Sequence, residues 1–143
     1  MEFKYKQHID RLLSLGIALP KLMIPNNKHS YRFIFKDLPE KNHIPQYITN
    51  PKRALTAIEK SSASTSGYAL SCFEREDKAK ARFASLEANI RNIRKTIGDS
   101  LASGTISESD GLISIAESNT THFDLYESCT CDLSTTFEYQ CAL

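Results

Sequence analysis

The chain has 143 residues, with 18 basic and 17 acidic side chains and a formal net charge of +1. Hydrophobic residues make up 41% of the chain and charged residues 24%, which are proportions of a globular domain rather than of a disordered chain. This length predicts a single domain over residues 1–143, and the balanced charge excludes a global field that would concentrate nucleic acid or an anionic membrane.

The first 36 residues predict one helix and one strand. Residues 2–15 carry apolar side chains at helical spacing, and Gly16 is a typical helix end. Residues 31–36 alternate between the two sides of an extended chain, with Tyr31 and Phe33 on one side and Arg32 on the other. We therefore expect an N-terminal helix, an ordered connection with turns over residues 17–30, where Pro20 and Pro25 stand, and then the first strand of a sheet.

A proline-rich and serine-rich stretch follows, over residues 37–66. Its prolines confine a short extended piece at 44–48 to the edge of a sheet. Residues 54–60 predict one or two helical turns, and 61–66 predict a polar loop. A second strand is expected at 67–72.

The clearest predicted element is a helix over residues 74–97. Acidic residues stand in its first turn and basic residues near its end, where each complements the helix dipole. A break near Asn89 or Asn92 would instead give one long and one short helix. One apolar stripe follows the whole length, at spacings of four and three residues: Ala79, Phe83, Leu86, Ile90, Ile93 and Ile97.

After residue 99 the pattern changes to short strands and turns. Strands are expected at 101–106 and 111–115, joined as a hairpin because Asp110-Gly111 is a strong turn signal. Two more are expected at 121–127 and 133–139. The sequence thus predicts an α+β fold, an antiparallel sheet of about five to six strands with the N-terminal helix and one long central helix packed on one face.

The four cysteines are Cys72, Cys129, Cys131 and Cys141. If residues 129–131 were a strand, Cys129 and Cys131 would share a face, and His122 or Cys141 could complete a zinc site. Structural zinc sites usually have two to four residues between paired cysteines, and here there is one. We therefore expect free thiols, with no metal and no cofactor.

Three separated polar segments define the first candidate site. Arg32 lies in the first strand, Ser64-Thr65-Ser66 precedes the second, and Glu127 ends a late one. This layout resembles that of one class of ADP-ribosyltransferases. The resemblance implies an enzyme that uses NAD: Arg32 would pair with the pyrophosphate, Ser66 would orient the nicotinamide end, and Glu127 would stabilise an oxocarbenium-like transition state.

Two further groups of residues are candidates for a functional role. His122 and Asp124 share one face of their strand and could act as a general base in a hydrolase, although the sequence marks no nucleophile for them. Lysines and arginines on the long helix could bind phosphates, but acidic residues interrupt them. Nucleic acid is therefore not an expected partner.

The leading hypothesis is a cytoplasmic protein-binding module, an accessory or regulatory subunit without a catalytic centre of its own. Its partner would be another protein or a second copy of the chain, with no membrane involved. The expected interface is the apolar stripe of the central helix, at Phe83, Ile90, Ile93 and Ile97. The alternative is the compact NAD-dependent transferase with Arg32, Ser66 and Glu127 as its catalytic residues, so whether the chain is an enzyme stays open at this point.

Overall fold

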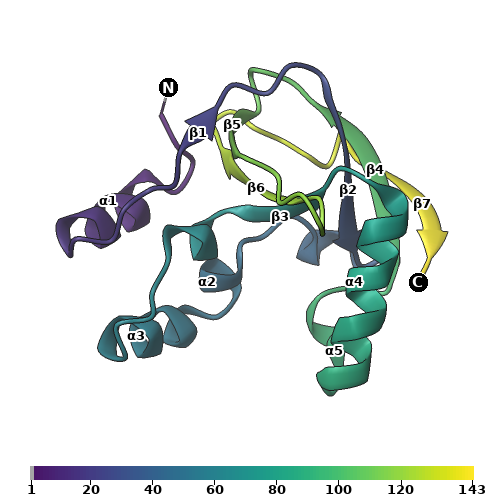
Figure 1. Ribbon diagram of the computed structural model, residues 1–143, viewed down its shortest axis with the longest axis horizontal. Helices are drawn as coiled ribbons and strands as arrows, with labels where there is room; N and C mark the ends of the chain where they lie inside the picture. The colour runs from purple at the N-terminus through teal and green to yellow at the C-terminus, as the bar shows by residue number, and fades with distance from the viewer. Residues whose placement is uncertain (1) are drawn as a thin grey trace.

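The computed structural model describes residues 2–143, which form one twisted antiparallel sheet flanked by helices (Figure 1). In sheet order the strands are β1-β5-β6-β3-β2-β4-β7. Their bounds in chain order are β1 Leu22–Met23, β2 Lys28–Ile34, β3 Leu70–Phe73, β4 Ser100–Ile106, β5 Gly111–Ser114, β6 His122–Glu127 and β7 Glu138–Ala142. The helices are α1 Lys6–Ser14, α2 Gln46–Thr49, α3 Pro51–Glu59, α4 Glu76–Asn89 and α5 Ile93–Thr96, with 3-10 turns η1 Pro39–Lys41 and η2 Thr65–Tyr68. The α+β class and the antiparallel sheet are confirmed, with one strand more than the predicted range.

Side chains alternate between two faces of this sheet, and different segments cover each face. On the first, which we call the loop-covered face, residues 128–137 cross the strands and bury Cys131, Leu133 and Phe137 against them. The strand residues of this core are Ile34, Leu70, Cys72, Ala102, Ile106, Ile113, Phe123 and Leu125. Each fully buried apolar side chain contributes about 1.5–3 kcal/mol relative to an exposed one, so this layer is a principal source of stability.

The opposite face, which we call the helix face, carries two separate groups of helices. Helices α1, α2 and α3 pack near the end of β6, where Ile9, Leu12 and Tyr47 belong to one cluster with Tyr126. Helix α4 packs over β2 and β3, where Phe83 lies edge-on to Phe33 with ring centroids 5.4 Å apart. The two groups stand apart in Figure 1, α1–α3 on the left and α4–α5 on the right.

The predicted single long helix is wrong, and the alternative with a break is what the structure shows. Helix α4 ends at Asn89, and the chain turns through Asn92, which has a left-handed φ of +61°, before α5 begins. Asparagine is one of the few residues other than glycine that adopt this conformation readily. Helix α4 therefore covers less of the sheet than the full stripe predicted.

The predicted hairpin is also wrong, although both of its strands exist. Strand β4 pairs with β2 and β7, whereas β5 pairs with β1 and β6. The turn itself forms, because the amide and hydroxyl of Ser107 donate to Asp110 Oδ2 at 2.8 and 3.2 Å. Gly111 is required beyond it: its φ is +150°, and a Cβ there would lie 2.1 Å from the carbonyl oxygen of Tyr126. The turn sends the chain from one half of the sheet to the other.

Two smaller expectations need correction. The extended piece expected at 44–48 is replaced by α2, which Pro45 precedes. The strand expected at 133–139 begins only at Glu138, because the residues before it cross the loop-covered face. Within residues 2–143, none of the helices has the length and apolar character that a membrane crossing needs.

Candidate functional site

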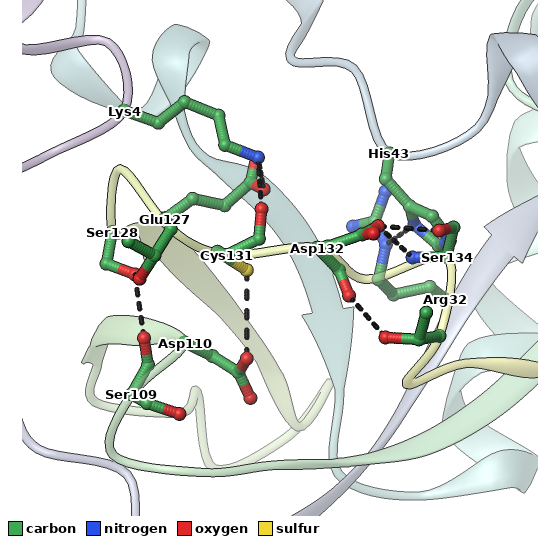
Figure 2. Close-up of polar contacts among 12 residues, drawn as sticks. Lys4, Arg32, His43, Ser109, Asp110, Glu127, Ser128, Cys131, Asp132 and Ser134 are labelled. Atoms are coloured by element: carbon green, nitrogen blue, oxygen red, sulfur yellow. Dashed lines mark hydrogen bonds and ion pairs between the residues drawn. The ribbon is translucent and has the colours of Figure 1, made fainter.

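Two of the three residues of the transferase layout lie buried on the loop-covered face, close to the segment 128–137 (Figure 2). Arg32 stands on β2 and is 7% exposed, and Glu127 ends β6 and is 3% exposed. Strand β3 lies between their strands in the sheet. The fold thus brings a cation and a carboxylate from distant parts of the sequence into one buried layer.

Arg32 is held by two hydrogen bonds to uncharged groups. Its Nε donates to His43 Nδ1 at 3.0 Å, and its Nη1 donates to the carbonyl oxygen of Ser71. Burial lowers the pKa of His43, and the positive charge of Arg32 lowers it further; together they bring it to about 3. His43 is therefore a neutral acceptor at neutral pH. Within residues 2–143 the guanidinium has no carboxylate within ion-pair distance.

Glu127 is fixed by the N-terminal segment. Lys4 Nζ lies 2.7 Å from Glu127 Oε2 and donates a second bond to the carbonyl oxygen of Cys131 at 2.6 Å. Burial lowers the pKa of Lys4, but the hydrogen bond and the charge of Glu127 outweigh it and raise the pKa above its ordinary value. The other carboxylate oxygen, Oε1, is buried without a hydrogen-bond partner in the described chain. Such an unmet acceptor costs about 1–3 kcal/mol or more, so it is a polar group that a ligand donor could satisfy.

Backbone pairing also ties the N-terminal segment to this corner. Phe3 forms an antiparallel bridge with Ser128, and the Lys4 amide donates to the Glu127 carbonyl oxygen at 2.9 Å. The Cys129 amide donates back to the Glu2 carbonyl oxygen at 2.9 Å. Residues 2–4 therefore hold the start of the 128–137 segment in place by backbone hydrogen bonds.

The predicted serine does not join the buried pair. Ser66 begins η2, and its hydroxyl shares a 2.8 Å hydrogen bond with Ser64 in an exposed turn. The neighbouring Thr65 is the buried member, and its hydroxyl lies 3.0 Å from the Tyr126 hydroxyl. The structure thus brings the serine-rich segment to the end of β6 through Thr65, while Arg32, Ser66 and Glu127 make no hydrogen bond with one another.

A small cavity of about 180 Å³ opens beside the Arg32–His43 pair. Its walls include Ile34, Phe35, Asn42, His43, Phe137 and Tyr139. Typical sites for drug-sized ligands measure roughly 300–1,000 Å³, so this cavity would hold only a fragment of such a ligand.

The helix face holds a second group of polar side chains, and the sequence predicted only two of its three members. His122 and Asp124 share this face as predicted, and the His122 Nε2 lies 3.6 Å from Asp124 Oδ1. The structure adds Ser71 from β3, whose Oγ lies 2.6 Å from the same Nε2. Alternation along the strand expected at 67–72 places Leu70 and Cys72 on one face and Ser71 on the other. The neighbouring residues in the sequence do not show which strand would lie beside Ser71.

Most of the predicted interface on the central helix is buried in the structure. Phe83 and Ile93 are each 3% exposed, and Ile97 is half-buried. Only Ile90 lies open, at 46% exposure. A continuous apolar stripe on a helix looks the same in sequence whether it packs inside its own protein or against a partner, and here Phe83 packs against Phe33 of the sheet.

The cysteines do not form a cluster. Cys129 is exposed and Cys131 is buried, so the two do not share a face as a strand would have made them do. Across residues 2–143 there is no group of three or more histidine, cysteine or acidic side chains placed to hold a metal ion.

Comparison with known proteins adds no relative: no family model, curated protein or solved structure matches this chain.

Proposed function

We propose that the chain is a protein-binding module whose binding surface is the open edge of the sheet at β1. We call this surface the β1 edge and define it as Leu22, Met23, Ile24 and Ile115. The observation that carries the proposal is its apolar exposure: Met23 is 50% exposed, Ile24 65% and Ile115 60%. Large apolar side chains exposed along the edge of a sheet are typical of an interaction site.

The register of the sheet places two of these side chains, Met23 and Ile115, on one side of the sheet, whereas Leu22 faces the other side, where it packs against the cluster that holds Tyr126. Leu22 pairs with Ser114 and Met23 with Ile113, so Ile115 extends β5 just past the end of the β1 ladder. Ile113 and Ile115 are two residues apart, so Ile115 shares the side of the sheet on which Met23 stands. The order of strands places β1 at one end of the sheet, with its outer backbone edge free in the described chain.

A free and apolar sheet edge suits one kind of occupant, an extended segment of a partner protein that adds as a further strand. Main-chain hydrogen bonds would give such a complex affinity, and alternate apolar side chains would give it specificity. Edges that must stay unpaired are usually protected by charged side chains. Between residues 17 and 27 the only charged side chain is Lys21, while the two-residue length of β1 and the flanking Pro20 and Pro25 limit an added strand to a short one.

Photocrosslinking tests this proposal in cells that naturally make the protein. A benzophenone side chain at position 23 is expected to capture one predominant partner, and Ile115→Glu in the same chain is expected to reduce that capture at least about tenfold because a charge would be buried in the complex. The matched control carries the benzophenone at Leu55, which is 47% exposed but lies on α3. An identical set of captured proteins from both positions would contradict the proposal, and capture of the chain itself would identify a homo-oligomer as the complex.

An NAD-dependent transferase is the second candidate, because two buried groups on the loop-covered face lack partners of the kind they need. Arg32 has no carboxylate, and Glu127 Oε1 has no donor, in the part of the chain that the structure describes. The pyrophosphate of NAD would supply an anion for Arg32, and a ribose hydroxyl would supply a donor for Glu127. Access to both groups requires that residues 128–137 move aside.

Thermal unfolding with millimolar NAD+ tests the second candidate. A ligand at 100 times its Kd stabilises the folded state by about 2.7 kcal/mol, which for this length raises the Tm by several degrees. Arg32→Lys keeps the charge but loses the forked geometry and is expected to reduce the shift, measured against its own ligand-free Tm. Absence of any shift in the unmodified protein would remove this candidate and leave the β1 edge proposal untouched.

A further inference from the structure

Ser71 and His122 meet on the helix face from two adjacent antiparallel strands. In the register of β3 and β6, Ser71 stands opposite Asp124 and Phe73 opposite His122, so Ser71 and His122 are diagonal neighbours. Their polar atoms lie 2.6 Å apart, within the range of a strong hydrogen bond between a hydroxyl and a ring nitrogen. This is the distance that lets a histidine take a proton from a serine hydroxyl.

Both groups are accessible and the ring is held in place. Ser71 is exposed, and the His122 side chain is 28% exposed. Phe73 packs edge-on against the imidazole, with ring centroids 5.4 Å apart at 68°. The His122 amide also donates to Thr120 Oγ1 at 3.3 Å, which fixes the start of β6. A small reagent can therefore reach the hydroxyl while the base stays oriented toward it.

Asp124 completes the group in an unusual position. Its Oδ1 lies 3.6 Å from the same Nε2 that Ser71 contacts, whereas the carboxylate of a serine hydrolase triad contacts the other ring nitrogen. A carboxylate at this place would stabilise the positive charge that His122 gains with the proton. The Asp124 side chain is 21% exposed, and its own amide donates to Ser114 Oγ at 2.9 Å, so its strand position is fixed.

We propose that Ser71 is a reactive serine, activated by His122, that accepts an acyl group from small activated carboxylic esters. The hydroxyl oxygen forms a bond to the acyl carbon while its proton passes to His122 Nε2. The carbon–oxygen bond to the leaving alcohol then breaks, and the alcohol departs with that proton. In the second half, water attacks the acyl carbon and passes one proton to His122 Nε2; the bond to the serine oxygen breaks, the carboxylic acid is released, and His122 gives that proton to Ser71.

The surroundings set limits on the rate and on the substrate. The residues from Leu70 to Phe73 are engaged in the β3–β6 ladder, so the backbone beside Ser71 is already committed to the sheet. A hydrolase normally presents free amides to the developing oxyanion, and each such donor contributes about a hundredfold to a thousandfold in rate. We therefore expect slow turnover, a long-lived acyl-serine, and a preference for esters with good leaving groups.

Incubation with 4-nitrophenyl acetate, followed by mass spectrometry of the intact chain and its peptides, tests the proposal. One acetyl group per chain is expected, located on Ser71. His122→Gln removes the base without removing the serine and is expected to slow acetylation by at least about a hundredfold. Asp124→Asn is expected to give a smaller loss, because it removes only the charge beside the ring.

Ser134→Ala serves as the matched control, because Ser134 is an exposed serine whose hydroxyl donates to Asp132 at 2.5 Å rather than to a histidine. It is expected to leave acetylation unchanged. Acetyl groups confined to lysines, or acetylation of Ser71 that is equally fast in the folded His122→Gln variant, would overturn the proposal. Ser71→Ala is expected to leave photocrosslinking from position 23 unchanged, because the β1 edge is a different surface, so the two proposals fail independently.

Discussion

Replacing Ile93 with aspartate is expected to lower the free energy of unfolding by at least about 4 kcal/mol, whereas the same change at Ile90 is expected to cost less than about 1 kcal/mol. The two isoleucines belong to the same apolar stripe in the sequence. Ile93 is 3% exposed at the start of α5, and Ile90 is 46% exposed at the end of α4. A carboxylate at 93 would replace a buried hydrocarbon and bring an unpaired charge with it, while one at 90 would remain in water.

Urea unfolding of the two variants, followed by circular dichroism, measures this difference directly. Ile93→Val is the conservative control and is expected to cost about 0.5–1.5 kcal/mol, because it removes one methylene group from the same site. Equal losses for the two aspartate variants would show that the helix break after Asn89 does not separate a buried residue from an exposed one. Full stability of the Ile93→Asp variant would show that Ile93 is exposed, and the stripe would again be a candidate binding surface.

Acidification from about pH 6.5 to about pH 4.5 is expected to remove roughly 2 kcal/mol of stability through His43 alone. Burial, with a further contribution from Arg32, lowers the pKa of His43 to about 3 in the folded protein, while in the unfolded chain it titrates near its ordinary value of 6.5. Between these two values the unfolded chain binds a proton that the folded protein does not. Stability from this group is therefore complete above about pH 6.5 and is lost as the pH falls toward about 3.

The measurement compares urea unfolding of the natural chain and of His43→Gln at both pH values. Glutamine offers an amide oxygen that can accept the Arg32 Nε–H and has no proton to gain, and its cost at the positive φ of 60° is the same at both pH values. Its stability is expected to fall less on acidification, by roughly the 2 kcal/mol assigned to His43. Parallel losses in the two proteins would contradict a neutral His43 beside Arg32 and would assign the acid sensitivity to other groups.

The sequence predicted local elements well where a pattern repeated over several turns or residues. The N-terminal helix, the helix at α3, the first strand and the strand at β6 all lie within a few residues of their expected positions. It also predicted that His122 and Asp124 share a strand face. These features follow from the spacing of apolar and polar residues, and that spacing is visible in a short stretch of sequence.

The pairing of strands and the use of the apolar stripe could not be predicted in this way. The Asp110-Gly111 turn forms as expected, yet its two strands separate because β4 finds a longer partner in β2 and β5 pairs with β6. The stripe on the central helix divides at Asn92, which takes a left-handed conformation between α4 and α5. Pairing free energy comes from contacts between distant residues, and a local pattern carries no information about them.

What the sequence determined by itself is therefore the alternation of faces, the helix periodicity and the residues able to carry chemistry. Only the tertiary structure decided which of those residues meet: Arg32 with His43, Glu127 with Lys4, and Ser71 with His122. The partners of each pair lie 11, 123 and 51 residues apart in the chain, and burial on one face or exposure on the other settles whether a reagent in solution can reach them. The order of strands in the sheet helps to set both the distance between the partners of a pair and their burial, because it determines which strands lie side by side.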